Sequence, residues 1–224
     1  MVVVGGTTPP VSLTTLSPEH IDDAAALTAA AFAGRPNVWG AICGSGTKVD
    51  EQRRFLSWLF ARNLWLRRDS GCNRAALLGG DLVCTFMFVP PGIPDVSLWD
   101  MVRAGLLKLP LLFGFGRLKR LLVAKDLEEG ELEGTEAFRL ERMVVAPAMQ
   151  GRGVGTRALR AALSEADAAG VPVVLTTNEA RNVAFYSRLG FEVLRSAKRS
   201  IEGESYQVWV MARQPLPLRA EASC

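Results

Sequence analysis

The sequence predicts an α/β protein, and three features of the chain support this prediction. Runs typical of strands alternate with amphipathic runs typical of helices over most of its length. A strand-like run at 138–145 leads through a glycine-rich loop into a helix that begins near Val154. Two apolar runs, at 74–78 and 82–89, flank Gly79-Gly80-Asp81, which is typical of a β-hairpin.

The composition fits one folded domain of 224 residues, 49% of them hydrophobic and 22% charged. We expect this domain to cover 1–224, with loose tails at 1–10 and 215–224. The net charge of +3 is small, so nucleic acid is not expected as a partner. The four cysteines are scattered and form no Cys-x-x-Cys pair, so neither a metal site nor a disulfide framework is expected. Residues 1–6 lack the basic and apolar regions of a signal peptide, and a cytoplasmic protein is expected.

The first part of the chain predicts a strand followed by helices. Alternation of apolar and polar residues at 11–16 indicates a half-buried strand. Ser17-Pro18 fits the start of a helix that runs to about Phe32. The glycine-rich stretch 34–48 is expected to be a loop or a broken helix, and helical spacing resumes over 49–67.

The least typical stretch is the leucine-rich segment 96–125, which we call the insert. Its longest charge-free run, 109–116, is too short for a membrane span of about 20 apolar residues. We expect two amphipathic helices, broken at Pro110 and at Gly114/Gly116, whose apolar face packs on the sheet or lines a pocket. A dimer face and a membrane-surface helix are the alternatives. The following stretch, 128–136, is expected to be an acidic linker.

The last part of the chain predicts a helix, a buried strand and a hairpin. The helix 154–169 carries a stripe of small and apolar residues and ends before Gly170, which suits the C′ position. The apolar run 173–175 predicts a strand. The segment 191–214 predicts a hairpin that turns at Glu202-Gly203-Glu204.

A glycine-rich loop, Gln150-Gly151-Arg152-Gly153-Val154-Gly155, joins the strand at 138–145 to the helix at 154–169. Glycines permit left-handed backbone conformations, and successive amides of such a loop converge on an anion beside the positive end of a helix. The spacing therefore predicts a phosphate cradle. Gly155-Thr156 lacks the lysine of a Walker loop, and the glycine spacing does not fit the dinucleotide fingerprint.

The loop matches the pattern Gln/Arg-x-x-Gly-x-Gly, and the segment 173–193 adds Asn182, Phe185-Tyr186 and Leu189-Gly190-Phe191. Together, over 138–193, these residues resemble the GCN5-related N-acetyltransferase (GNAT) superfamily. The resemblance implies an α/β GNAT fold: a central mixed, mostly antiparallel sheet of about six or seven strands with splayed central strands and helices on both faces. The insert at about 96–125 would be an extra helical element. Acetyl-CoA is implied as the acyl donor, with no metal.

The same resemblance implies which groups hold coenzyme A. The loop amides would face its pyrophosphate, the strand backbone near 143–145 would pair with the pantetheine arm, and Asn182 would bond that arm. The implied donor-binding residues are Met143, Val144, Val145, Gln150, Gly151, Arg152, Gly153, Val154, Gly155, Thr156, Asn178, Asn182, Phe185 and Tyr186.

Acetyl transfer to an amine needs a base, because a lysine-like ammonium has a pKa of about 10.4 and must first lose its proton. Glu141 on the central strand is the candidate base. Alternation puts Glu141 on one face with Arg139 and Met143, opposite Arg142, and an ion pair with either arginine is the alternative interpretation. By resemblance, Tyr186 stands near the coenzyme A sulfur as the acid, and a packed core aromatic is the alternative.

The leading hypothesis is an enzyme that moves an acetyl group from acetyl-CoA to a primary amine of a small molecule or protein. The alternative is a non-catalytic acyl-CoA-binding module that contacts a partner through the insert. A homodimer is compatible with both. Membrane contact is not expected, although a membrane-surface transferase is a third hypothesis. The acceptor itself has no readable code in the sequence.

Overall fold

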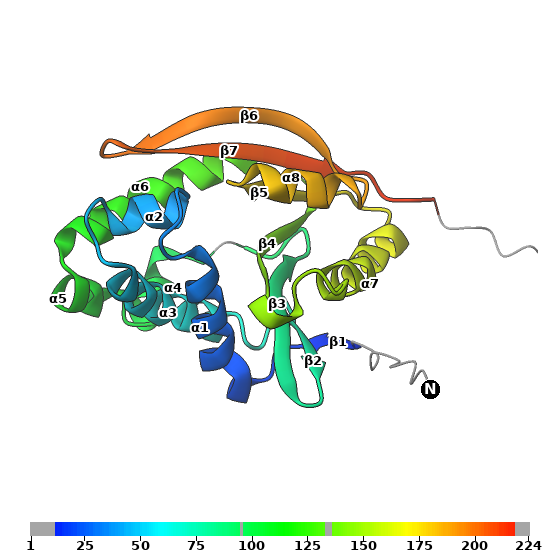
Figure 1. Cartoon of the computed structure of the whole chain (residues 1–224), viewed down its shortest axis with the longest axis horizontal. Coiled ribbons are helices and arrows are strands. Elements are labelled where there is room, and N and C mark those ends of the chain that lie inside the picture. Colours follow the sequence, from blue (N-terminus) through cyan, green and yellow to red (C-terminus); the bar gives the residue numbers. More distant parts are fainter. Residues whose placement is uncertain (1–11, 95, 133–135, 218–224) are drawn as a thin grey trace, which may run out of the picture.

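The computed structural model describes residues 12–94, 96–132 and 136–217, which are built around one seven-stranded sheet (Figure 1). The strand order is β1-β2-β3-β4-β5-β7-β6. Every neighbouring pair is antiparallel except β4 and β5, which run parallel. The expected mixed, mostly antiparallel sheet is therefore confirmed.

The strands include both expected hairpins, β2–β3 and β6–β7. Their bounds are β1 Ser12–Thr15, β2 Asn73–Leu78, β3 Asp81–Val89, β4 Phe138–Val145, β5 Val173–Thr177, β6 Glu192–Ile201 and β7 Glu204–Arg213. The turns of both hairpins contain glycines at positive φ, at Gly79-Gly80 and at Gly203, where a glycine avoids the steric cost of a Cβ.

Helices cover both faces of the sheet (Figure 1). Their bounds are η1 Pro18–His20, α1 Ile21–Phe32, α2 Val38–Cys43, α3 Val49–Leu66, α4 Leu98–Arg103, η2 Leu106–Lys108, α5 Leu109–Phe113, α6 Phe115–Leu132, η3 Pro147–Met149, α7 Val154–Ala169 and α8 Ala180–Ser187. The stretch 34–48 is a broken helix, since α2 begins where the Asn37 side chain accepts the Gly40 N–H.

Two hydrophobic cores lie on opposite faces of the sheet. One packs α1, α2, α3 and the insert helices, and the other packs α7 and α8. The buried stripe of α7 includes Ala158, Ala162 and Ala166, as the sequence predicts. Such small side chains let α7 lie close to the sheet. Gly170 follows at φ +67 and ends the helix in the expected left-handed conformation.

The insert differs from its prediction of two helices. It forms α4, η2, α5 and the first part of α6. Pro110 opens α5 instead of breaking a helix, because the first turn has no amide partner for a proline to remove. Gly114 does break the chain, at φ +86, but Gly116 lies inside α6.

The prediction of an acidic linker at 128–136 is wrong for residues 128–132, because these belong to α6, which ends at Leu132. A single glycine in a helix costs only about 1 kcal/mol, and Ala124 on the same helix is buried in the core. That packing outweighs the local penalty. Residues 133–135 of the expected linker lie outside the described residues. So do the tails 1–11 and 218–224, whereas 214–217 have neither helix nor strand.

Candidate active site

The central strands β4 and β5 separate halfway along. Among the described residues they pair only over Phe138–Leu140 and Val173–Leu175. Beyond that point β4 stays bonded to β3, and β5 to β7. The backbone edge of β4 from Glu141 onward therefore faces a gap that an extended ligand can enter as an extra strand. The splayed strands implied by the family resemblance are confirmed.

A β-bulge at Arg142 reorders the side chains of β4. Met87 pairs with Glu141 and Thr85 with Val144, so two residues of β4 stand opposite the single residue between them on β3. Arg142 has φ +50. Met143 consequently packs in the α7 core, while Arg142 reaches Asn63 of α3 on the other face.

The strict alternation expected for β4 is therefore wrong. Glu141 and Arg142 lie on the same side of the sheet, and Met143 lies on the opposite side from Glu141. One extra residue in a strand inverts the side of every residue that follows. The expected alternative of an ion pair is present: a Glu141 oxygen lies 2.8 Å from Nη2 of Arg142, and the other lies 3.7 Å from Nε of Arg139.

The glycine-rich loop has the geometry of an anion cradle. Gly151 and Gly153 both have φ +74. Gly153 is the N-cap of α7 and has no side chain that could accept hydrogen bonds from the first-turn amides. These N–H groups can therefore donate hydrogen bonds to an anion. A Cβ on Gly155 would lie only 3.0 Å from Val145 and 3.7 Å from Phe185, so the helix start approaches β4 and α8 closely.

The other predicted loop residues surround this cradle. Gln150 is exposed and its Nε2 donates to the Val145 carbonyl over 3.1 Å. Arg152 is exposed and Thr156 half-buried, whereas the Val154 side chain is buried in the core, so only its amide can reach a ligand. Val144 is buried at the end of β4.

Two asparagines stand at the other side of the gap. The Asn178 Nδ2 donates to the Gln207 carbonyl over 2.8 Å, and the Asn182 Nδ2 donates to Oγ1 of Thr177 over 3.1 Å. Asn182 and Tyr186 both belong to α8 and both line the cavity described next, as their spacing predicts.

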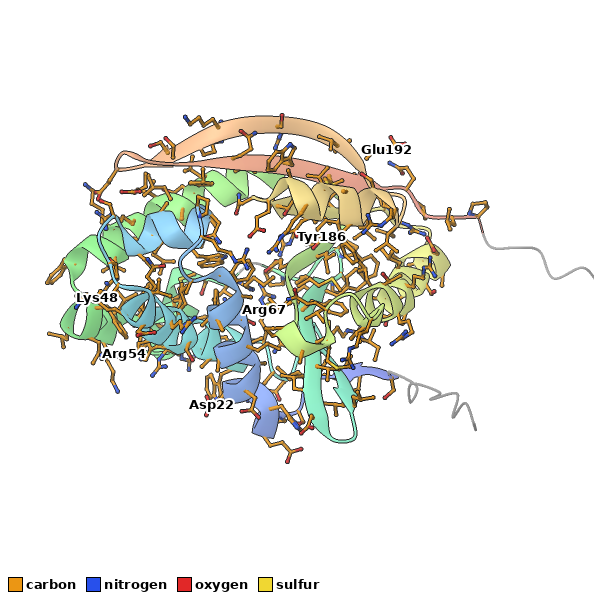
Figure 2. The ribbon with its side chains drawn as sticks, viewed as in Figure 1. Asp22, Lys48, Arg54, Arg67, Tyr186 and Glu192 are labelled. Carbon is orange, nitrogen blue, oxygen red and sulfur yellow. The ribbon has the colours of Figure 1, made fainter. Side chains whose placement is uncertain are left out.

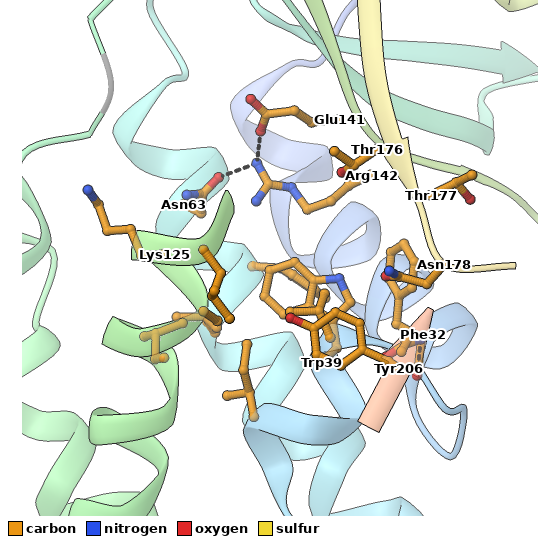
Figure 3. Close-up of a pocket in the computed structure, with 18 of the residues that line it drawn as sticks. Phe32, Trp39, Asn63, Lys125, Glu141, Arg142, Thr176, Thr177, Asn178 and Tyr206 are labelled. Atoms are coloured by element: carbon orange, nitrogen blue, oxygen red, sulfur yellow. Dashed lines mark hydrogen bonds and ion pairs between the residues drawn. The ribbon is translucent and has the colours of Figure 1, made fainter. Parts of the chain in front are cut away.

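A cavity of about 250 Å³ opens on the α1–α3 side of the gap (Figure 3). Five predicted site residues line it: Glu141, Met143, Asn178, Asn182 and Tyr186. The loop 150–156, Val144, Val145 and Phe185 do not. The splayed strands thus lie between the glycine-rich loop and the cavity, and Tyr186 of α8 lies in the middle of the molecule (Figure 2).

Much of the cavity wall is aromatic and comes from residues that the sequence did not single out. Phe32, Trp39, Trp58, Phe60 and Tyr206 line it. The Trp39 and Phe60 rings meet edge to face at 4.8 Å. In Figure 3 the Trp39 and Tyr206 rings lie at one end, and Asn63, Arg142 and Glu141 lie at the other.

The insert supplies another wall, from Met101, Ala104, Leu106, Leu121 and Lys125. This confirms the expectation that the insert lines a pocket. No local signal marked these residues, because they come together only when three separate helical elements, α4, η2 and α6, pack.

A second carboxylate at the cavity, Glu179, also escaped prediction. It pairs with Arg35 at 3.2 Å and with Arg181 at 2.5 Å. The Arg35 contact joins the α1–α2 connection to the start of α8 across 144 residues of sequence. Only the folded chain brings these two groups together.

Tyr186 is buried among Phe185 and Phe191, whose rings lie 5.1 and 5.6 Å away. Burial raises the pKa of its hydroxyl above the ordinary value, and the nearby Cys84 adds to the effect. Burial also raises the pKa of Cys84, to about 12. The phenol therefore keeps its proton and remains a hydrogen-bond donor through neutral and mildly alkaline pH.

No helix in the described parts of the chain combines the length and apolarity that crossing a membrane requires. The same parts hold no cluster of three or more His, Cys, Asp or Glu side chains suited to a metal ion.

Comparison with known proteins places residues 114–193 in the family model of the acetyltransferase (GNAT) domain. A solved structure from Corynebacterium glutamicum, a histone acetyltransferase HPA2 and related acetyltransferase, matches with a TM-score of 0.63, at 16% identity over 94% of this chain and 99% of its own. The polyamine N-acetyltransferase of Drosophila melanogaster matches with a TM-score of 0.54, at 12% identity over 92% and 100%. A putative acetyltransferase from Salmonella typhimurium, solved with acetyl-CoA, matches with a TM-score of 0.52, at 16% identity over 96% and 99%.

Proposed function

We propose that this chain is an acetyltransferase of the GNAT superfamily, whose domain model matches residues 114–193, and that it transfers the acetyl group of acetyl-CoA to the primary amine of a small, largely apolar molecule. The observation that carries the proposal is the partly open cavity with aromatic walls beside the gap between β4 and β5. Small-molecule sites are typically concave, mostly apolar and equipped with a few convergent polar groups.

The residues present fit coenzyme A. Amides of Gly151, Gly153 and the α7 start would bind the pyrophosphate, because these glycines leave the approach open and the helix end is uncapped. The unpaired edge of β4 would bond the pantetheine amides, with Asn182 opposite. Acetyl-CoA would supply the acetyl group as a thioester, which an amine can attack.

Tyr186 would donate a hydrogen bond to the departing sulfur. Its burial keeps the hydroxyl neutral, as a donor must be. It lies on the cavity side of α8, together with Asn182, so one helix would serve both the pantetheine arm and the sulfur.

Glu141 would accept the proton of the attacking amine. Its carboxylate lines the cavity, and the Arg142 and Arg139 guanidinium groups hold it in place. Because Arg142 already occupies one oxygen, transfer through a bridging water suits this geometry better than direct contact.

The size of the cavity favours a small molecule over a folded protein as the acceptor. A cavity of about 250 Å³ lies just below the range of typical small-ligand sites, roughly 300–1,000 Å³. Helices α2, α3, α4 and α6 all contribute to its wall, so a folded protein surface has little room to approach.

The test is an amine panel with acetyl-CoA, following thiol release and confirming each product by mass spectrometry. We expect acetylation of at least one apolar primary amine, and loss of most of that rate in Glu141→Gln. Asp126→Asn, an exposed acidic residue of α6 outside the cavity lining, is the matched control. Tight coenzyme A binding without acetylation of any amine would instead favour the non-catalytic binding module.

A further inference from the structure

We propose that the acceptor carries a carboxylate beside its amine, and that Arg62 binds this carboxylate. The proposal rests on the function proposed above and names its substrate class as an apolar amino acid or a similar small amino-carboxylate. Arg62 belongs to α3 and lines the cavity next to Asn63, the residue that bonds Arg142.

The Arg62 guanidinium is held in place with part of its bonding capacity unused. It lies over the Trp58 ring at 4.0 Å, and its Nη1 donates to the Trp58 carbonyl over 3.2 Å. Among the described residues its buried Nε has no hydrogen-bond partner. Burial lowers the pKa of this arginine, and the charge of Asp22 works in the opposite direction. A guanidinium fork in such a place suits a planar carboxylate.

The carboxylates already at the cavity are taken by other arginines. Glu141 is paired with Arg142 and Arg139, and Glu179 with Arg35 and Arg181. Among the described residues that line the cavity, each acidic side chain therefore has two guanidinium partners. A second ammonium group on a diamine acceptor would find no carboxylate to itself, whereas an anion would find Arg62.

The aromatic end of the cavity indicates the chemistry of the rest of the acceptor. Trp39, Phe32 and Tyr206 form an apolar surface away from Glu141 and Arg142 (Figure 3). An amino acid with an apolar side chain can place its amine near Glu141, its carboxylate at Arg62 and its side chain on these rings. All three parts then meet a group of suitable chemistry.

The test compares amines that differ only by the carboxylate: phenylalanine with phenethylamine, and tryptophan with tryptamine. We expect kcat/KM to be at least about tenfold higher for the acid of each apolar pair, the gain from a charge-assisted hydrogen bond. Arg62→Gln should reduce that ratio by about ten- to a hundredfold, and Arg62→Lys should retain part of it. Arg54→Gln, exposed on the same helix and outside the cavity lining, is the control.

Preference for the decarboxylated amine, or an unchanged ratio in Arg62→Gln, would overturn the inference and leave the acetyltransferase function intact. If no amine is turned over, a binding measurement still tests the inference about the carboxylate separately from the acetyltransferase function. N-acetylphenylalanine should bind the parent more tightly than N-acetylphenethylamine in calorimetry, and Arg62→Gln should abolish the difference. Equal binding of both products by the parent would also overturn the inference.

A separate observation concerns the outer side of the insert, and from it we infer a docking surface for an anionic lipid membrane. Large apolar side chains are exposed there at Trp99 (69%), Leu107 (70%), Leu111 (86%), Leu112 (54%) and Phe115 (76%), which we call the insert patch. The segments that carry it are in contact, since η2 touches α4 and α5, and α5 touches α6. Figure 1 shows α5 at one end of the molecule, with α7 toward the other.

The charge around the insert patch identifies the partner. From residue 99 to 125 the chain has six Lys or Arg residues and one acidic residue, Asp100. Arg103 and Lys108 among these are exposed, and so is Lys119, which pairs with Glu202 at 2.8 Å. Exposed apolar side chains bordered by basic residues are typical of elements that lie in the interface of an anionic bilayer. A second copy fits less well, because a two-fold contact would bring the same basic residues face to face.

Vesicle sedimentation tests this surface. The protein should pellet with vesicles of phosphatidylcholine mixed with phosphatidylglycerol, and much less with phosphatidylcholine alone. The double variant Leu111→Ser/Phe115→Ser should reduce pelleting about tenfold or more. Leu194→Ser, at a side chain 63% exposed on β6, should leave it unchanged. Absence of pelleting with anionic vesicles would overturn the inference. Concentration-dependent dimers that the double variant abolishes would then assign the patch to a second copy.

Discussion

The proposed donor and acceptor sites differ in what builds them. The donor site over 138–193 consists mainly of backbone: glycines at positive φ, a helix start and an unpaired strand edge. The acceptor cavity consists of side chains from α1, α2, α3, α4, α6 and the strands. The family model covers 114–193, which includes all of the first region and, of the second, mainly α6. A site that binds its ligand through backbone groups requires glycines at fixed spacing, so it leaves a recognisable pattern in the sequence. A site lined by side chains from many elements leaves no such pattern.

The largest expected effect is at the cradle, in Gly153→Asn. At φ +74 a valine would strain the backbone, but asparagine tolerates this conformation and still adds a side chain. The coenzyme A Kd should rise by about 10²–10³, the loss of one or two charge-assisted amide bonds to phosphate. Calorimetry measures the affinity.

Gly203→Asn is the matched control for Gly153→Asn. It has φ +91, lies in the open β6–β7 turn and should leave coenzyme A binding unchanged. Parental affinity in Gly153→Asn would show that the donor site is not built from this backbone, and the contrast between the two regions would fail.

Tyr186→Phe should lower kcat by about 10² while coenzyme A still binds, because general acid catalysis contributes about 10²–10⁴ and a thiolate is a fair leaving group. Burial raises the pKa of Tyr186, so the parent keeps its phenol proton as pH rises. The defect should shrink above the thiol pKa of about 8.5, where the sulfur leaves without needing a proton. The measurement is kcat between about pH 7 and 9.5.

Calorimetry with coenzyme A is the control for this change, and Tyr186→Phe should bind coenzyme A as the parent does. A Tyr186→Phe enzyme with parental turnover at every pH would leave Tyr186 as a packing residue of the α7 core.

Asp167→Asn should destabilise the donor region by about 2 kcal/mol, because Arg213 is then left without its charge partner. The two side chains form a bidentate pair at 2.7 and 2.9 Å that ties α7 to β7. Hydrogen bonding from Arg213 lowers the pKa of Asp167. This stabilisation is thus present above the unfolded pKa of about 3.9 and is lost as pH falls toward the lower folded value.

Urea unfolding of parent and Asp167→Asn at neutral and acidic pH measures this contribution. Asp50→Asn, in an exposed pair with Arg53, should change nothing measurable. If the free energy of unfolding differed between the parent and Asp167→Asn by the same amount at low pH, the stabilisation would not come from the ion pair.

The smallest effect on coenzyme A binding is expected from Leu106→Ala in the insert. Leu106 lines the cavity and is 7% exposed, so truncation enlarges the acceptor site. The KM for apolar amines should change severalfold and the coenzyme A Kd by less than about twofold. Deleting 106–117 is a poorer experiment, since it removes the buried Leu109 and Arg117. A large loss of coenzyme A affinity in Leu106→Ala would join the two regions into one site.

The sequence alone determined the elements whose causes are local. Helix α7, both hairpins and the glycine-rich loop follow from the spacing of apolar residues, the position of Gly170 and the glycines of the turns. These signals act within a few residues, so they survive in any context. The resemblance over 138–193 rests on the same backbone requirements.

Only the tertiary structure decided the face of Arg142, the end of α6 and the walls of the cavity. The bulge in β4 depends on its register with β3, and α6 continues past Gly130 because its middle turns, around Leu121 and Ala124, are packed in the core. The Arg35–Glu179 pair joins residues 144 positions apart. Register, packing and long-range pairing depend on the whole fold, and for that reason no window of sequence contains them.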